Sequence, residues 1–280
     1  MSEWQDFIGK TMVQRDVLTP GLAQRHGATL DLPLPEAVAL PGIHWCLCLP
    51  EAATAELGTD GHPRRDIAGS FLPPIPLPRR MWASSSVEFL MPIPVGAMVE
   101  RTSTIADIAA KSGSSGQLVF VTVEHVTRVN GAEAVREKQS IVYREATGAA
   151  PAFLAPRDGD ASVDAAEWPN QRKLVPSEPL LLRFSALTFN AHRIHYDLPY
   201  ARDEEGYAGL VVHGPLTATF LLNHATSVFD APVRRFNFRG ASPAFCGEPL
   251  TLAARREGNT VTLAAINGEG QTVMTGDASI

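Results

Sequence analysis

An amide and two imidazoles stand close together in residues 184–197, which read Phe-Ser-Ala-Leu-Thr-Phe-Asn-Ala-His-Arg-Ile-His-Tyr-Asp. The imidazoles, His192 and His195, are three residues apart and can share one face of a turn, and the amide of Asn190 precedes them. Further on, residues 213–215, His-Gly-Pro, open an apolar run, and a proline in the first turn is typical of a helix start. The first N–H groups of a helix lack intrahelical partners and can bind an oxyanion. Addition of water to an acyl thioester, or its removal, would use these groups.

In such a hydration, a base takes a proton from water while the thioester oxygen collects negative charge. His195 is the natural base because imidazole titrates near neutrality. We expect Gly214 to offer its N–H to the oxygen, where the helix dipole also favours negative charge. Asn190 cannot exchange protons, so its amide would orient the water or the imidazole. The second proton carrier stays open, and His192 and His213 are the further candidates for catalysis or for lining the pocket.

Several of these residues also have a structural interpretation. Asp197 precedes Leu-Pro199, so we expect it to cap a helix start rather than to take part in catalysis. Three imidazoles, His192, His195 and His213, could together bind zinc or iron. No carboxylate or thiol completes that set at a recognisable spacing, and we therefore expect no metal.

The pattern resembles the signature of MaoC-like (R)-specific enoyl-CoA hydratases, which runs Asp-x-Asn-x-x-His-x-Asp and continues later with His-Gly. Asn190 falls on the family's catalytic Asp, His192 on its Asn and His195 on its catalytic His. Asp197 falls on the Asp that follows, and Gly214 on the oxyanion glycine. Asn and His at the first two positions resemble one subgroup, the mitochondrial-type 3-hydroxyacyl-thioester dehydratases and the mesaconyl- and itaconyl-CoA hydratases.

This resemblance implies an α+β double hot dog, in which two antiparallel sheets each wrap a helix. It implies a hydro-lyase that adds water to a 2-enoyl-CoA, or dehydrates the 3-hydroxyacyl thioester. The substrate would be a short acyl-CoA, such as a dicarboxylic one of the mesaconyl or itaconyl type. No cofactor beyond the CoA thioester substrate is expected, and the protein would form a homodimer or higher homo-oligomer. Two alternatives remain: a hot dog thioesterase and a non-catalytic acyl-CoA binding protein.

Two runs of strand-like segments, rich in Val, Ile, Thr and Phe, divide the chain. The first run covers residues 84–91, 97–109, 117–129 and 134–143. The second covers residues 234–239, 249–256, 260–267 and 272–280. Between them, residues 148–176 lack sustained periodicity and contain several prolines, so we interpret them as a linker. The predicted domains are a degenerate N-terminal hot dog, 1–147, and a catalytic C-terminal hot dog, 177–280.

The N-terminal half lacks a copy of the Asn-x4-His pattern, so we expect it to form pocket walls rather than to supply catalytic groups. Its most distinctive segment is the proline-rich stretch 73–82, which ends in Arg-Arg-Met-Trp. Guanidinium groups match phosphates and carboxylates in geometry, so arginines are candidates for binding CoA or a substrate carboxylate. The predicted substrate-binding residues are Arg79, Arg80, Trp82, Arg193 and Arg239.

Composition narrows the class of protein further. The 280 residues are 45% hydrophobic and 19% charged, as in a soluble globular protein, with a net charge of -6. That charge gives no basic field for nucleic acid or anionic membranes. The apolar run 209–229 is interrupted by His and Asn, so we interpret it as a buried helix rather than a membrane span. The first residues lack the features of a signal peptide, and we expect a cytoplasmic protein.

Three cysteines, Cys46, Cys48 and Cys246, cannot all pair with one another. The first two alternate as strand residues do, and no second ligand pair stands at the spacing of a zinc site. We therefore expect free, buried thiols.

Overall fold

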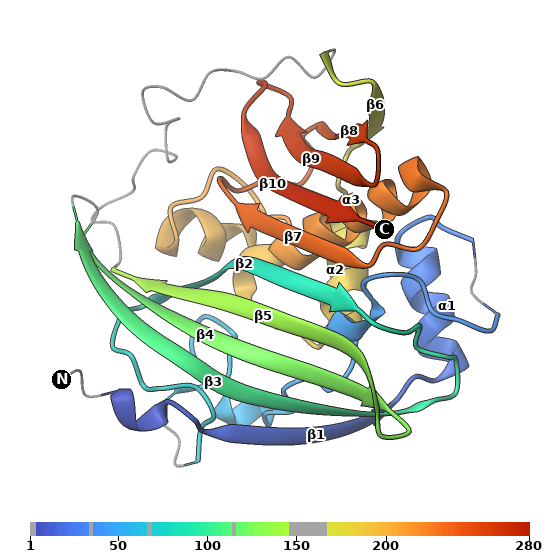
Figure 1. Cartoon of the computed structure of the whole chain (residues 1–280). Coiled ribbons are helices and arrows are strands. Elements are labelled where there is room, and N and C mark those ends of the chain that lie inside the picture. The colour runs from blue at the N-terminus through green and yellow to red at the C-terminus, as the bar shows by residue number, and fades with distance from the viewer. Residues whose placement is uncertain (1–3, 34–35, 66–68, 114–115, 146–166) are drawn as a thin grey trace.

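The computed structural model describes residues 4–33, 36–65, 69–113, 116–145 and 167–280. They form an α+β structure around a ten-stranded antiparallel sheet, in the order β1-β3-β4-β5-β2-β7-β10-β9-β8-β6 (Figure 1). The strands are β1 (Thr11–Val17), β2 (Arg79–Phe89), β3 (Met98–Gly113), β4 (Gly116–Val129), β5 (Ala132–Arg144), β6 (Asn170–Leu174), β7 (Arg235–Gly240), β8 (Leu250–Glu257), β9 (Thr260–Asn267) and β10 (Thr272–Ser279). The helices are α1 (Pro20–Thr29), α2 (Glu178–Leu187) and α3 (Gly214–Phe229), with short helical turns η1 (Gln5–Phe7), η2 (Ile43–Cys46), η3 (Thr54–Glu56), η5 (Arg193–His195) and η6 (Tyr200–Glu204).

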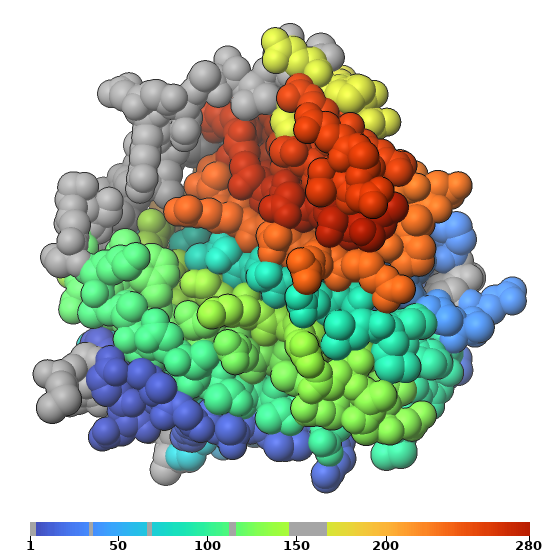
Figure 2. Space-filling view, viewed as in Figure 1, coloured from blue at the N-terminus to red at the C-terminus, as the bar shows by residue number. Residues whose placement is uncertain are grey.

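The two halves of the sheet meet where β2 pairs with β7, from Ser84 opposite Arg239 to Glu88 opposite Arg235. The N-terminal half supplies β1 to β5 and the C-terminal half β6 to β10, and Figure 2 shows the two halves packed against each other along this seam. The arrangement is the expected double hot dog, except that the two predicted sheets join edge to edge. They join because β2 and β7 each pair with one strand of their own half and leave the other edge free.

Helix α3 is the helix that the C-terminal half of the sheet wraps, and it packs against β7, β8, β9 and β10. Pro215 stands in its first turn, and Asp230 ends it in the left-handed conformation with a φ of 53°. Residues 216–225 are all buried, which explains why apolar residues occupy every side of the helix. The predicted buried helix is confirmed, although it begins only at Gly214. No helix among the described residues is long and apolar enough to span a membrane.

The described part of the N-terminal half contains no helix as long as α3. Helix α1 packs mainly against α2, and the four residues of η2 lie in the core beside α3. Gly42 starts η2 with a φ of 94°, and a Cβ there would lie 2.9 Å from Cγ2 of Thr219 on α3. A side chain at position 42 would therefore separate the turn from the helix. This half is degenerate, as predicted, because short turns fill the space of a long helix.

Cys46 lies in η2 and Cys48 has a φ of 53°, so the predicted strand alternation at these residues is wrong. Leu47, between the two cysteines, is buried as well, so the segment has no alternation of buried and exposed residues. The expectation of free thiols is confirmed: Cys46 and Cys48 are buried, and Cys246 is half-buried.

The predicted linker, 148–176, extends too far. Residues 170–174 form β6, which pairs with β8 at the edge of the sheet. Their alternation is between half-buried and exposed side chains, so the segment lacks the apolar signal of an inner strand. Strand β1, at the opposite edge, was missed for the same reason. Residues 148–166 of the linker lie outside the described residues, and the division into domains stays a prediction.

Candidate active site

His195 lies at the end of η5, with 7% of its surface exposed. Its Nδ1 is 2.7 Å from the carbonyl oxygen of Val211. A carbonyl can only accept, so Nδ1 carries the proton and the neutral ring has its lone pair on Nε2. No described residue forms a hydrogen bond with Nε2. This nitrogen is not fully enclosed, so a ligand can reach it. His195 therefore presents an accessible basic nitrogen.

An extended segment before α3 fixes the position of this imidazole. The N–H of Val211 donates to the carbonyl of Ile194 at 2.9 Å, and that of Val212 donates to the carbonyl of Ala244 at 2.8 Å. The segment is therefore held between η5 on one side and the connection from β7 to β8 on the other. It aligns His195 with His213, the residue directly before α3.

The ring of His213 stacks on that of His195, with centroids 3.6 Å apart and planes 19° from parallel. Its Nε2 is 2.8 Å from Oγ of Ser185 on α2, and its Nδ1 is buried without a partner. Burial, and then the charge that His195 would carry, hold the pKa of His213 well below its usual range. Burial likewise lowers the pKa of His195 to about 3, against the opposing effect of its hydrogen bond to Val211. Both rings are neutral at physiological pH, as a proton acceptor must be.

The start of α3 faces open space. Gly214 is the first residue of the helix, and no described residue accepts a hydrogen bond from its N–H. A Cβ built on Gly214 would have no atom within 4 Å. There is thus room beside the helix N-terminus for a thioester oxygen, at the position where the dipole favours negative charge.

Asn190 shapes the loop that carries the histidines. Its Oδ1 accepts from the N–H of His192 at 2.9 Å, and its own N–H donates to the carbonyl of Ser185 at 2.9 Å. Phe189, directly before it, has a φ of 47°, which marks a tight turn after α2. The amide oxygen is therefore engaged in the turn. The role of Asn190 in orienting water stays a prediction.

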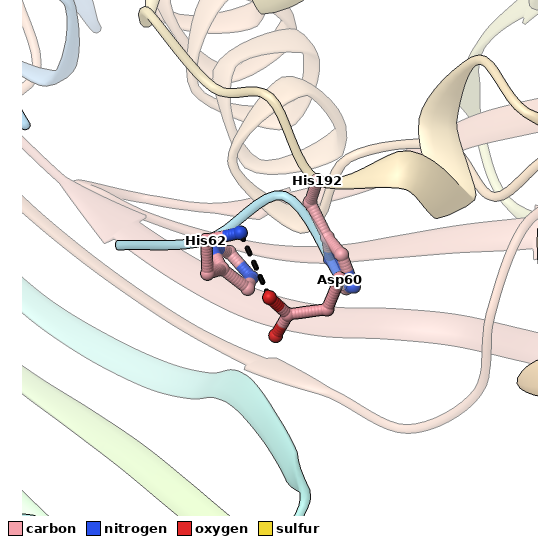
Figure 3. A group of neighbouring side chains, drawn as sticks. All are labelled: Asp60, His62 and His192. Atoms are coloured by element: carbon pink, nitrogen blue, oxygen red, sulfur yellow. Dashed lines mark hydrogen bonds between the residues drawn. The ribbon is translucent and has the colours of Figure 1, made fainter. Parts of the chain in front are cut away.

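A fourth imidazole, that of His62, joins His192, His195 and His213 from the N-terminal half. Its ring lies over that of His192 with centroids 4.2 Å apart (Figure 3). The ring centroid of His192 lies 5.6 Å from that of His195. Asp60 accepts from the N–H of His62 at 2.9 Å, and ligand atoms of Asp60, His62 and His192 all lie within 4.8 Å of one another. Sequence reasoning missed His62. The turn sequence Asp-Gly-His-Pro was the available signal, but only the folded chain places it here.

The two adjacent arginines of β2 have different surroundings. Nε of Arg79 is 3.4 Å from a carboxylate oxygen of Glu205, and Nη2 donates to the backbone carbonyl of the same residue at 2.8 Å. The guanidinium of Arg79 is thus already paired. Arg80 has no carboxylate partner among the described residues and lies near His62 and His192, whose pKa values it lowers.

The other predicted substrate-binding residues lie in different settings. Trp82 donates through Nε1 to Oγ of Ser85 at 2.9 Å and packs edge-on against Trp45, so it belongs to the core. Arg193 pairs with Asp197 at 2.7 Å, and Arg239 is exposed on β7. These contacts account for Trp82 and Arg193 without a substrate, and their predicted role stays untested.

The expected helix cap at Asp197 is confirmed. Its Oδ1 accepts from the N–H of Tyr200 at 3.1 Å, at the start of η6. Its other carboxylate oxygen, Oδ2, accepts a hydrogen bond from the guanidinium of Arg193. Both oxygens are engaged, which agrees with a structural role.

Comparison with known proteins identifies the family. The family model for hydroxyacyl-thioester dehydratase type 2 matches residues 42–246, from the start of η2 to the connection between β7 and β8. The chain belongs to this family. It is a hydratase or dehydratase of acyl thioesters, the class of enzyme predicted from the sequence.

One curated relative of this hydroxyacyl-thioester dehydratase, the mesaconyl-C(4)-CoA hydratase of Chloroflexus aurantiacus, is 41% identical over 98% of the chain and 96% of the relative. A solved MaoC-like dehydratase is 14% identical, with a TM-score of 0.73 over 98% of each chain. A Mycobacterium tuberculosis protein described as a double hot dog has a TM-score of 0.58, at 14% identity, over 97% of this chain and 96% of its own. These two structures confirm the predicted fold.

Proposed function

We propose that the protein adds water to a 2-enoyl-CoA of the mesaconyl type, or catalyses the reverse dehydration, with His195 as the base. The observation that carries this proposal is the hydrogen bond from Nδ1 of His195 to Val211, which leaves the Nε2 lone pair accessible. Water bound to Nε2 would lose its proton there as its oxygen adds to the β-carbon of the substrate. The electrons of the double bond move to the thioester oxygen, and an enolate forms.

The start of α3 supplies the stabilisation that this enolate needs. The N–H of Gly214 has no acceptor within the described protein and faces open space, so it can donate to the developing oxyanion. Protonation of the α-carbon then completes the addition. The imidazolium of His195 is one candidate donor, and His192, whose ring lies 5.6 Å away, is the other.

Ser185 and His213 would keep the base in position. Because His213 is neutral and stacked at 3.6 Å, it holds the plane of His195 without repelling the imidazolium that forms. The hydrogen bond to Ser185 fixes the rotation of the His213 ring in turn. Both residues act through His195, and we assign them positioning roles.

The relative's printed name supports the choice of substrate. In a mesaconyl-C4 thioester, the β-carbon carries a methyl group and a free carboxylate. The chain matches the mesaconyl-C(4)-CoA hydratase over nearly its whole length, including the segments that hold His62, Arg80 and His195. A thioesterase would use a carboxylate to activate water, but Asp60 and Glu205, which lie near His192, are engaged with the N–H of His62 and with Arg79.

The test is a dual assay on mesaconyl-C4-CoA. Loss of absorbance from the conjugated enoyl thioester, with no release of free thiol, is the expected result. Release of thiol at the same rate would instead identify a thioesterase. Saturable binding with neither signal would identify a non-catalytic acyl-CoA binding protein.

We further propose that the enzyme works without metal or redox cofactor, in the cytoplasm, and as a homodimer or higher homo-oligomer. Hydration involves no net oxidation or reduction, and the described residues offer a candidate for each step. Exposed apolar side chains at the β1 edge support self-association: Val13 is 53% exposed, Val17 42% and its neighbour Met98 64%. Light scattering on the full chain measures the oligomeric state.

A further inference from the structure

A loop of the N-terminal half is locked to the loop that carries His192. The N–H of Arg193 donates to the carbonyl of Asp60 at 2.9 Å, and its Nη1 donates to that of Thr59 at 3.0 Å. Gly61, with a φ of 86°, approaches so closely that a Cβ would lie 1.9 Å from the carbonyl oxygen of Ala191. Only glycine permits this contact. The position of His62 relative to the catalytic loop is therefore fixed by backbone geometry.

Three imidazoles form a continuous row from this loop to the proposed base. His62 and His192 have ring planes 35° apart with centroids 4.2 Å apart (Figure 3). His192 in turn meets His195 edge-on. Burial, and next the positive charge of Arg80, hold the pKa of His62 well below its usual range. The same two causes lower the pKa of His192 to about 4. Both rings are therefore neutral, and each can donate one N–H.

Arg80 adds a cation to this row. Successive side chains of a strand point to opposite faces, and Arg79, its neighbour on β2, pairs with Glu205. Arg80 is half-buried and lies opposite Tyr143 of β5, and its charge also lowers the pKa of His62 and His192. No carboxylate among the described residues forms an ion pair with it. The nearby Asp60 is hydrogen-bonded to the N–H of His62 and stabilises the loop. A half-buried guanidinium beside neutral donors is an environment that suits an anion.

We propose that Arg80, together with His62 and His192, binds the free carboxylate of the substrate. This inference rests on the proposed hydration of a mesaconyl-type thioester. In that substrate the carboxylate is bonded to the carbon that receives the water, so its binding site must lie beside the base. The row leads directly to His195. Binding there would also fix which face of the double bond meets the water.

A divalent cation is the competing occupant of the same residues. Asp60, His62 and His192 provide one carboxylate and two imidazoles, which is a common ligand set. The positive charge of Arg80 lowers the pKa of both imidazoles, so it opposes a cation there and favours an anion. Glu205 also lies 4.0 Å from Nε2 of His192, but its charge is balanced by Arg79. The charges around these residues therefore favour the carboxylate.

The experiment compares two unreactive thioesters that differ only at one group. Succinyl-CoA carries a carboxylate on its β-carbon, and butyryl-CoA carries a methyl group there. Competitive inhibition by each is measured for the wild type, Arg80→Gln, Arg80→Lys and His62→Gln. The control is Arg15→Ala, which removes an exposed guanidinium paired with Glu100 on β3, at the far edge of the sheet. Thermal melting confirms that each variant is folded.

Arg80→Gln should weaken binding of succinyl-CoA on the order of a hundredfold and leave butyryl-CoA within about threefold. His62→Gln should give a smaller loss of the same selectivity, and Arg80→Lys should restore part of it. Arg15→Ala should match the wild type. Hydration of mesaconyl-C4-CoA should fall in parallel with succinyl-CoA binding.

Equal losses for both inhibitors, or no loss for either, would overturn the proposal, because Arg80 would then bind CoA phosphates or serve the fold. Loss of wild-type activity after treatment with a chelator, restored by zinc, would also overturn it. A wild type that hydrates crotonyl-CoA but not mesaconyl-C4-CoA would refute the proposed substrate. If the wild type also bound butyryl-CoA more tightly than succinyl-CoA, the carboxylate site would be refuted as well, independently of the reaction.

Discussion

Each half of the molecule buries a cluster of titratable side chains, one around Glu137 and His44 and one around His195 and His213, and the two clusters differ in how far they are enclosed. In the N-terminal half, the carboxylate of Glu137 accepts from Nε1 of Trp45 at 3.1 Å and from Oγ of Ser85 at 2.5 Å. His44 lies 3.8 Å from it and is 5% exposed. Burial raises the pKa of Glu137 and lowers that of His44 to about 3. Nε2 of His44 is fully enclosed and has no hydrogen-bond partner.

His195 has a pKa equally far from its usual value, yet its Nε2 is not fully enclosed. It also lies beside a helix that begins with Gly214, whereas the N-terminal half has only the turn η2 in a comparable place. A shifted pKa therefore does not separate the two clusters. The two clusters differ instead in an accessible lone pair next to an unpaired N–H group, which His195 has and His44 lacks.

The largest expected effect is the loss of hydration rate when His195 is replaced, and it distinguishes the two clusters directly. His195→Gln should lower the hydration rate on the order of a hundred- to ten-thousand-fold, because the base is lost. Its melting temperature should stay close to that of the wild type. Enoyl-thioester absorbance and thermal melting are measured on the same preparations.

His44→Gln is the matched variant in the N-terminal half. It should lower the melting temperature and leave turnover per folded molecule within about threefold, since His44 is part of an enclosed network. The comparison fails if His44→Gln abolishes turnover in a folded protein or if His195→Gln retains it.

Gly214→Ala probes the open space at the start of α3. The variant should fold normally, because a Cβ there meets no atom within 4 Å and alanine suits the first turn of a helix. Hydration should fall on the order of a hundredfold, since the methyl group would displace the thioester from the N–H. The corresponding variant in the other half, Gly42→Ala, should instead lower stability through its contact with Thr219. Wild-type kinetics in Gly214→Ala would show that no substrate occupies this space.

A moderate effect is expected at Asn190. Asn190→Asp should keep substantial activity, because a carboxylate oxygen can also accept from the N–H of His192. Asn190→Leu should lose it, since the turn that places His192 and His195 loses its acceptor. Rates and melting temperatures of the two variants are compared. Full activity of Asn190→Leu would mean that the turn forms without this side chain.

The smallest effect concerns stability, and the two histidines that should cause it, in α1 and β4, both lie in the N-terminal half. Burial lowers the pKa of His26 to about 4 and that of His125 to about 4. The unfolded chain therefore binds protons below pH 6.5 that the folded chain does not, so stability falls as the pH drops from about 6.5 towards 4. Each such histidine contributes about 1.4 kcal/mol per pH unit in that window.

His26→Leu removes one of these groups, and it should flatten the dependence of unfolding free energy on pH by about that slope. Denaturant titrations at several pH values between 4 and 7 give the slope. An unchanged slope in His26→Leu would mean that His26 titrates equally in both states.

The sequence indicated the inner strands and the loop that carries His192 and His195, but not the contacts between the halves. Strands with Val, Ile and Thr on buried faces were predicted within a few residues, and so was α3. The edge strands β1 and β6 were missed because their exposed faces carry polar side chains. Nothing in the local pattern shows that Arg79 pairs with Glu205, since these residues are far apart in sequence and meet only in the folded chain.

His62 shows the same limit within the site. It was overlooked because the N-terminal half was expected to form walls only, and its segment has no helical or strand period. Its position depends on the close contact between Gly61 and Ala191, which is a property of the tertiary fold. By contrast, His195 and Gly214 could be selected from the sequence, because residue type, spacing and an adjacent helix start together indicated their chemistry.

The most direct test of the account is a crystal structure with an unreactive mesaconyl-type thioester bound. We expect the thioester oxygen to lie about 2.7–3.1 Å from the backbone nitrogen of Gly214, with the β-carbon facing Nε2 of His195. An acyl group bound elsewhere, with its thioester away from the start of α3 or its β-carbon facing the Glu137 cluster, would contradict it.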